Sequence, residues 1–518
     1  MQRLLVKKDQ YRDSVSLMQL SLELKEGAGL QEAFVAMGTP ANREILTEMG
    51  ISKDQLEGVG PNDLMIALLA ENEETIEKGI LSIPALLEGT RARSEGGESY
   101  QPRTLEQALR QLPEANLVLI SNPGPYASGE ARRALEKGLH VMIFSDNVPV
   151  EDEIALKKLA QQRGLLLMGP DCGTALLNGK PLCFANVVPS GAIGIVGASG
   201  TGIQEVSCAI ACRKEGVSQA IGTGGRDLSR EVGGLMMAEG IKALAQDSQT
   251  QVIMVISKPP APEVAEKITS QLASCGKPGV VCFIGEKQQF NEGTLWFADS
   301  LAMAASLAVA LVRGETPGPL LLDDKLLERI AIEETSGMSD EQCFLRGLYT
   351  GGTLADEAIY LLESGVGPIY SNIHKEKELQ LTDPTRSREN TIIDLGDDYF
   401  TRGKPHPMID PSGRAARIAE EAKDPQVAAL LLDLVLGYGS HPDPAGAIYS
   451  AVIGAKETAR ARGGRLAVIA SITGTVGDPQ GLQRQRETLE RAGCRVMASN
   501  QEAASLVERI LQHRAVRS

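Results

Sequence analysis

Residues 192–205 read AIGIVGASGTGIQE, and this stretch decides the fold. An apolar run comes first, glycines at 197, 200 and 202 follow, and helix-forming residues begin directly afterwards. This order predicts a strand, a tight loop and the N-terminus of a helix. The free N–H groups and the positive dipole end of such a helix bind anions, most often phosphate. We therefore expect phosphate to bind at Gly197, Ala198, Ser199, Gly200, Thr201 and Gly202.

This stretch departs from three common glycine-rich motifs. A Walker loop needs a lysine after its last glycine, but Ile203 stands there. A dinucleotide fingerprint would need a third glycine where Glu205 places a carboxylate. A nucleophile elbow needs a second glycine where Thr201 stands. We therefore interpret Ser199 as a phosphate ligand.

The rest of the chain repeats the same alternation of strand and helix. Short apolar or β-branched runs are separated by helical segments, which predicts an α/β fold with parallel sheets covered by helices on both faces. These runs occupy residues 117–121, 141–145, 165–168, 193–196, 251–257, 279–284, 429–434 and 465–470. Turn signals near 187–191 and 314–319 divide the chain, and we expect domains at 1–189, 190–314 and 343–518.

Composition narrows the class of protein. Lysine and arginine total 52 against 67 acidic residues, a net charge of −15 that repels nucleic acid but leaves room for small anionic metabolites. The eight scattered cysteines are typical of free thiols in a reducing compartment. No apolar stretch reaches the length of a membrane span. We expect a cytoplasmic protein that binds neither nucleic acid nor membrane.

Two further loops are candidates for substrate binding. Gly224 and Gly225 precede Arg226, whose guanidinium can hold a carboxylate or phosphate through two hydrogen bonds. The alternative is a tight turn with Arg226 paired to a neighbouring carboxylate. Asp171 and Cys172 follow a strand, at the end where α/β sheets bind ligands. The alternative for Asp171 is a backbone cap in a turn between domains.

A third candidate loop lies in the last domain. Gly437, Gly439 and Ser440 form a glycine-rich loop after a strand, and we expect them to supply a second phosphate-binding helix N-terminus that faces the first. His441 closes this loop, and His406 is the other histidine in a plausible site. The carboxylates of 394–398 suit either a Mg²⁺ ion or a solvated acidic turn, and we assign no metal site.

These motifs resemble the succinyl-CoA synthetase family. Residues 115–313 are similar to its alpha subunit through the 169–172 turn, the 194–202 loop and the 222–227 loop, and residues 391–510 are similar to the end of its beta subunit. The resemblance implies a Rossmann-like CoA-binding-type domain followed by two flavodoxin-like ligase-type domains.

The chain departs from that family at three places. The phosphorylated histidine of the ligases should lie within 285–290, but no histidine occurs between residues 141 and 373. The glutamate that supports it is replaced by the 257–260 segment, Ser-Lys-Pro-Pro. The glycine loop that holds CoA is absent from residues 7–13, so CoA is a doubtful cofactor. Residues 314–390 are also too few for a nucleotide-binding ATP-grasp module.

A narrower resemblance covers nearly the whole chain. Signatures at 13–18, 144–148, 197–202 and 404–408 are similar to the FdrA family, which implies a subunit of oxamate carbamoyltransferase in purine and allantoin breakdown. That enzyme splits oxalurate with phosphate into oxamate and carbamoyl phosphate. The resemblance implies phosphate or carbamoyl phosphate as substrate and other subunits as partners. We then expect Arg226, Ser199 and His441 to be the catalytic residues.

Two alternatives stay open. An acyl-CoA synthetase of the succinate type would use His441 or His406 in place of the lost histidine. A subunit without catalytic activity would bind a small anionic metabolite at the same loop.

Overall fold

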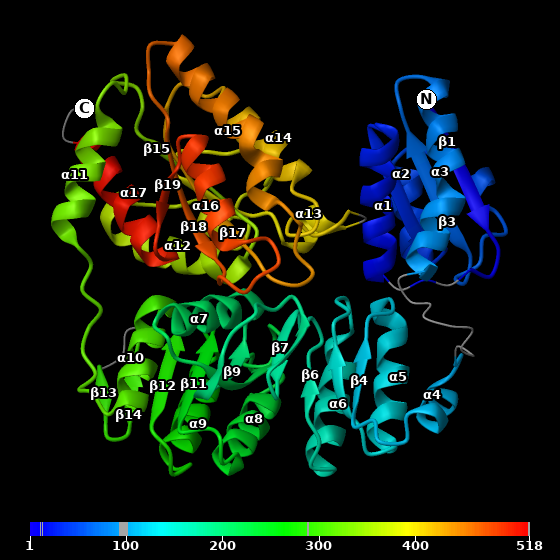
Figure 1. Cartoon of the computed structure of the whole chain (residues 1–518), viewed down its shortest axis with the longest axis horizontal. Helices are drawn as coiled ribbons and strands as arrows, with labels where there is room; N and C mark the ends of the chain where they lie inside the picture. Colours follow the sequence, from blue (N-terminus) through cyan, green and yellow to red (C-terminus); the bar gives the residue numbers. More distant parts are fainter. Residues whose placement is uncertain (11, 13, 93–101, 287–289, 403, 516–518) are drawn as a thin grey trace.

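The computed structural model describes residues 1–515 apart from 11, 13, 93–101, 287–289 and 403. Figure 1 shows four β-sheets with helices packed against them. The predicted α/β class is confirmed, and the eight predicted strands are all present. Among the described residues, no helix is both long and apolar enough to cross a membrane.

The N-terminal domain has an antiparallel sheet in the order β1-β3-β2. The central strand, β3, is an unbroken apolar run, and helices and neighbouring strands therefore bury it. Its elements are β1 (Gln2–Lys7), α1 (Ser14–Ala28), β2 (Glu32–Met37), α2 (Pro40–Glu48), a 3₁₀ turn (Lys53–Leu56), β3 (Leu64–Leu69) and α3 (Glu73–Ala92).

A second, parallel sheet of order β4-β5-β6 follows. Its elements are α4 (Leu105–Gln111), β4 (Leu117–Ile120), α5 (Gly124–Glu136), β5 (His140–Ile143), α6 (Val150–Gln162) and β6 (Leu167–Met168). Residues 1–189 therefore do not form the one Rossmann-like domain that we expected. They hold two separate sheets with separate hydrophobic cores, and their last two strands join the next sheet.

The third sheet has eight strands in the order β13-β14-β12-β11-β9-β10-β7-β8. Strand β9 pairs in parallel with β10 on one side and β11 on the other. The carboxyl end of β9 is thus the switch point of the sheet, where connections leave in opposite directions and ligands bind. The elements are β7 (Thr174–Leu177), β8 (Lys180–Cys183), β9 (Ser190–Ala198), α7 (Gly200–Cys212), β10 (Val217–Gly222), α8 (Leu235–Gln246), β11 (Val252–Ser257), α9 (Pro262–Ala273), β12 (Gly279–Phe283), β13 (Asn291–Glu292), β14 (Leu295–Phe297) and α10 (Leu301–Arg313).

The fourth sheet is parallel, with the order β16-β15-β17-β18-β19. Strand β15 lies between β16 and β17, so its carboxyl end is the switch point of this sheet. The elements are α11 (Asp324–Thr335), β15 (Phe344–Tyr349), α12 (Gly352–Val366), a 3₁₀ turn (Lys377–Leu379), β16 (Thr391–Asp394), α13 (Asp398–Thr401), α14 (Ser412–Glu421), β17 (Val427–Val435), α15 (Pro444–Ala461), β18 (Ala467–Thr473), α16 (Leu482–Arg491), β19 (Arg495–Met497) and α17 (Asn500–Ala515).

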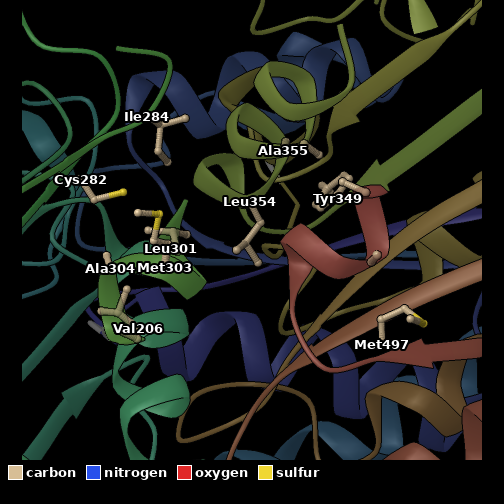
Figure 2. Close-up of a cluster of buried hydrophobic side chains, with 14 of the residues drawn as sticks. Val206, Cys282, Ile284, Leu301, Met303, Ala304, Tyr349, Leu354, Ala355 and Met497 are labelled. Atoms are coloured by element: carbon tan, nitrogen blue, oxygen red, sulfur yellow. The ribbon is translucent and has the colours of Figure 1, made fainter. Parts of the chain in front are cut away.

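One hydrophobic core joins the third and fourth sheets. Figure 2 shows Val206, Cys282 and Leu301 from the third sheet and its helices in the same cluster as Tyr349 and Leu354 from the fourth. Helices α7 and α10 pack against α12 and α17 in this core. Shared burial of this kind fixes the orientation of α7 relative to α12.

Candidate functional site

A cavity of about 520 Å³ lies where the carboxyl ends of the strands of three sheets meet. Both switch-point loops, after β9 and after β15, reach it. Helix α1 of the N-terminal domain adds Met18 to the wall. The remaining described lining residues are Ser121–Pro123, Phe144–Asp146, Asp171–Thr174, Phe184, Gly197–Thr201, Gln204, Gly222, Gly224, Gly225, Lys258, Thr350, Gly352, Thr353, Asp394, Gly396–Asp398, Thr401, Lys404, His406, Met408 and Ile409.

The predicted phosphate loop forms the N-terminus of α7 at this cavity. Ser199 is the N-cap, and its Oγ accepts a 2.9 Å hydrogen bond from the N–H of Gly202. The first helical residues, Gly200 and Thr201, have no acceptor for their N–H groups within the helix. Gly202 is not a lining residue, and its N–H is taken up by the cap. The loop can therefore offer a ligand the backbone N–H groups of Gly200 and Thr201.

The second helix N-terminus at the cavity belongs to α12, which sequence reasoning missed. Ser199 Oγ and Thr353 Oγ1 lie 2.6 Å apart and share a hydrogen bond, so the first turns of α7 and α12 meet. The buried carboxylate of Asp433 accepts from the N–H groups of Thr350 and Gly351 at 2.8 and 2.9 Å, which holds the loop in place. The signal was the Gly351-Gly352 pair, which follows a mostly apolar strand after one residue, Thr350.

Lys258, at the end of β11, brings a positive charge to this cavity. Its Nζ lies 2.8 Å from Asp356 Oδ2. Burial opposes the charge, but the carboxylates of Asp356 and Asp394 outweigh it and raise the pKa of the ammonium above its ordinary value. Two helix dipoles and one ammonium therefore converge on the same cavity.

Asp394, at the end of β16, is a buried carboxyl of the cavity wall. Burial raises its pKa to about 7, although the charge of Lys258 and a 2.8 Å hydrogen bond from the N–H of Gly396 oppose the shift. A carboxyl with this pKa holds a proton for part of the time at neutral pH and can act as a general acid or base. A Cβ at Gly352 would lie 2.4 Å from Asp394 Oδ2, so the glycine makes room for this side chain.

Another part of the wall is acidic. Confinement in the cavity and the nearby Asp146 and Asp398 carboxylates raise the pKa of Asp171 to about 7. Burial raises the pKa of the neighbouring Cys172 thiol to about 12, and its Sγ lies 3.5 and 3.4 Å from the carbonyls of Thr174 and Gly222. The thiol therefore stays protonated and unreactive. Among the described residues, no group of three His, Cys, Asp or Glu side chains has metal-binding geometry.

His406 lies at the cavity wall as a neutral imidazole. Burial lowers its pKa to about 4. The N–H of Met408 donates to Nδ1 at 3.2 Å, so Nδ1 carries a lone pair and Nε2 carries the proton. Nε2 lies beside Gly396, where a Cβ would come within 2.6 Å. The ring is therefore a hydrogen-bond donor at Nε2 and not a nucleophile.

Arg226, which we predicted to be a substrate ligand, is not part of the described cavity wall. Its guanidinium lies 2.9 Å from Glu153 Oε2 and donates to the carbonyl of Val148 at 2.8 Å. Glu153 also pairs with the fully buried Lys157, 2.8 Å away, so these charges connect α6 to the 223–227 loop. Gly224 and Gly225 do line the cavity.

The loop after β17, which we predicted to be the second phosphate loop, is not part of the described cavity wall. Gly437, Gly439, Ser440 and His441 are absent from the described wall of the cavity. Tyr438 forms a β-bridge with Ala185, and Gln480 accepts from the N–H of Gly437. His441 accepts at Nδ1 from the N–H of Asp443. The loop therefore packs against residues 184–186 and Gln480, while Tyr438 is 49% exposed.

Three family models match parts of the chain. A CoA-ligase model matches residues 348–510, and a CoA-binding-domain model matches residues 190–285. A model described as AllF, heavy metal-associated domain, matches residues 1–103. The CoA-binding model thus falls on the eight-stranded sheet and not on residues 1–189, where we expected it. The part of the chain that should carry the phosphorylated histidine includes 287–289, which lie outside the described residues.

Relatives cover the chain to different extents. Succinate–CoA ligase subunit alpha-2 of Trichomonas vaginalis is 31% identical over 33% of this chain and 56% of its own length, and the alpha subunit of Aquifex aeolicus is 28% identical over 30% and 51%. The chain thus spans little more than half of these subunits. A dinucleotide-forming acetyl-coenzyme A synthetase of Ca. Korarchaeum cryptofilum overlaps 78% of this chain and 83% of its own, at 17% identity and a TM-score of 0.28.

One relative is similar over almost the whole length of the chain. The uncharacterized protein YahF of Escherichia coli K12 is 44% identical over 98% of this chain and 98% of its own length. Its match runs through all four sheets, including the N-terminal domain. The chain therefore belongs to the same family as YahF, with an AllF-type N-terminal domain and succinyl-CoA synthetase-like CoA-binding and CoA-ligase domains.

Proposed function

We propose that this protein binds phosphate, or a carbamoyl or acyl phosphate, between the N-termini of α7 and α12. In this proposal it is a subunit of a carbamoyl- or acyl-transferring enzyme of the oxamate carbamoyltransferase type. The observation that carries the proposal is the meeting of the two helices at Ser199 and Thr353, 2.6 Å apart, at one cavity. Two helix N-termini that converge stabilise a dianion better than one.

In this proposal, Lys258 supplies the positive charge that balances the charge of the bound phosphate. A phosphate between the helices takes hydrogen bonds from free backbone N–H groups of both first turns and an ion pair from the ammonium. The AllF-type domain and the FdrA resemblance of the sequence support a carbamoyl group as the part transferred. The CoA-ligase and CoA-binding models support the wider class of acyl transfer.

The reaction proposed for the cavity is phosphorolysis of a ureido group. A phosphate oxygen attacks the terminal carbonyl carbon of oxalurate, and the bond from that carbon to the oxamate nitrogen breaks. The leaving nitrogen takes a proton from the protonated carboxyl of Asp394, which then ionises. His406 offers a neutral N–H donor at the same wall for a carbonyl oxygen that gains charge. The proton of the attacking hydrogen phosphate returns to the ionised Asp394, and carbamoyl phosphate and oxamate leave.

Hydrogen exchange in the full chain tests the binding step. Inorganic phosphate should slow exchange of the amides at 199–203 and 352–355, and Thr353→Val should weaken this protection because it removes the hydroxyl that joins the two helices. The control is Thr458→Val, which removes a hydroxyl bonded within α15. Unchanged exchange with phosphate in the wild-type chain would refute the proposed site.

Activity requires a separate assay. Purified protein, alone and mixed with candidate partner subunits, should release oxamate from oxalurate only when phosphate is present. Loss of that activity in Lys258→Met, with the fold intact, would support the assigned charge. Phosphate-independent cleavage would contradict the proposed chemistry.

The second candidate function is an acyl-CoA synthetase of the succinate type, which the CoA-ligase and CoA-binding models favour. It needs a residue that carries phosphate, and His406 is the histidine of the described cavity wall. Its Nε2 carries a proton, so this atom has no lone pair for attack on phosphorus. Incubation with labelled ATP tests this candidate, because an acid-labile labelled protein would support it over carbamoyl transfer.

A further inference from the structure

The N-terminal domain does not fit a heavy-metal carrier, although its family model is described as heavy metal-associated. Soft metals in such domains are bound by cysteine thiolates and histidine nitrogens. Residues 1–103 contain neither, because the first histidine is His140 and the first cysteine is Cys172. Lys7 ends β1 and Lys8 begins the loop to α1, and Lys8 Nζ lies 2.7 Å from Asp63 Oδ2. A lysine ammonium repels a metal cation at this position.

The same domain touches the cavity. Met18, in the second turn of α1, is part of the cavity wall. In Figure 1 the domain lies beside α13, and α1 is the helix that faces it. The segment 397–409, which follows β16, contributes Asp397, Thr401, Lys404 and His406 to the same wall. One side of the cavity thus consists of this segment and α1.

Charged contacts connect the domain to that segment. Lys25 Nζ, in the last turn of α1, lies 3.4 Å from Ser412 Oγ and 3.9 Å from Asp410 Oδ2. Arg402 lies 3.3 Å from Glu44 of α2, and both of these side chains are more than half exposed. Exposed ion pairs of this kind contribute little stability and weaken in salt.

The hydrophobic cores of the N-terminal domain are separate from those of the other sheets. The two hydrophobic clusters of the N-terminal domain are built from residues 4–87 alone, whereas one cluster spans the third and fourth sheets. A domain with its own core and a polar contact surface is expected to move relative to its neighbour. The third and fourth sheets are expected to stay together.

We propose that the N-terminal domain is a movable wall of the cavity and not a metal carrier. It closes the cavity when Lys25 and Glu44 pair with Asp410 and Arg402, and it positions the 397–409 segment that holds His406. This inference rests on the proposed function only for the identity of the ligand. The movement itself concerns the protein without ligand.

Hydrogen exchange without phosphate tests the movement in the full chain. Lys25→Glu places a carboxylate against Asp410 and Glu32, and we expect exchange of the amides at 404–410 to speed up at least threefold. Lys25→Arg keeps the positive charge and should leave exchange within twofold of the wild type. The matched control is Lys137→Glu, which breaks the Lys137–Glu106 ion pair and should leave 404–410 unchanged.

Two outcomes would overturn the proposal. Unchanged exchange at 404–410 in Lys25→Glu would show that the domain does not hold the segment. Stoichiometric binding of Cu(I) or Zn(II) that slows exchange in β1 and α1 would restore the metal-carrier role. Phosphate protection of 199–203 is measured separately, so a failed movement and a failed phosphate site give different results.

Discussion

The loops after β15 and after β17 look alike in sequence, yet only the first reaches the cavity. Both follow buried strands of the same parallel sheet, and both contain glycines before a helix. Gly352 and Thr353 line the cavity, whereas Gly437 packs on Ala185. The number of glycines therefore does not distinguish an anion-binding loop from a structural one.

Strand order explains the difference. Strand β15 lies between β16 and β17, so the connections on its two sides diverge and leave its carboxyl end open. Strand β17 lies between β15 and β18, and residues 184–186 pack against the loop that follows it. The same rule places the loop after β9 at the switch point of the eight-stranded sheet. The two switch points face each other, and this position selects the functional loops.

The largest expected effect comes from a methyl group at the open loop. In Gly352→Ala the new Cβ meets Asp394 Oδ2 at 2.4 Å and displaces the carboxyl beside Lys258. Phosphate affinity should fall roughly 10- to 100-fold, since hydrogen bonds to charged groups contribute about 1.5–3 kcal/mol. Calorimetric titration with phosphate measures the loss.

The fold should survive this change, because alanine favours a helix more than glycine does. Gly454→Ala is the matched control, since a Cβ there meets nothing within 4 Å. Normal phosphate binding by Gly352→Ala would remove α12 from the proposed site.

A methyl group in the loop after β17 should lower stability and leave phosphate binding unchanged. Gly437 has φ of +107°, and a Cβ there would lie 2.5 Å from the carbonyl oxygen of Ala185. Gly437→Ala should lower the free energy of unfolding by about 1–3 kcal/mol, through backbone strain and this clash. Denaturant unfolding measures the loss, and the folded fraction should bind phosphate normally.

Gly463→Ala separates the two causes. Its φ is +80°, but nothing lies within 4 Å of the added Cβ, so only the backbone strain remains. If Gly463→Ala is as damaging as Gly437→Ala, the contact between the loop and residue 185 is unimportant.

Only part of the candidate site could be predicted from the sequence. The loop at 197–202 could be predicted because its strand, glycines and helix start are contiguous. Lys258, Asp394 and His406 come from separate elements, and only the fold brings them together. The pairing of α12 with α7 depends on strand order in two sheets. Arg226 looked like a ligand because its partner Glu153 lies in helix α6, distant in the sequence.

A smaller effect, on the pH dependence of thermal stability, should follow from Asp394→Asn. Burial raises its pKa to about 7, so the folded state favours the protonated carboxyl. The carboxyl stabilises the fold most below its ordinary pKa of 3.8, and this contribution is lost as the pH rises through 7. The melting temperature of Asp394→Asn should therefore exceed that of the wild type by an amount that grows from pH 4 to 7 and then levels off.

Activity completes the test of Asp394. If this carboxyl donates the proton, the amide variant loses the high-pH decline of the rate together with most of the rate itself. Wild-type and variant melting temperatures that stay parallel across this pH range would contradict the raised pKa.

The smallest effect is expected at His441, and it is the most direct test of the two loops. His441→Ala removes an acceptor for the N–H of Asp443 and leaves the backbone bond from His441 to Met408 intact. The unfolding free energy should fall by about 1 kcal/mol at most, since a neutral hydrogen bond contributes roughly 0.5–1.5 kcal/mol. Phosphate affinity should change less than twofold, because the imidazole is not part of the described cavity wall. A tenfold loss of affinity would return the loop after β17 to the site and make strand order an insufficient guide.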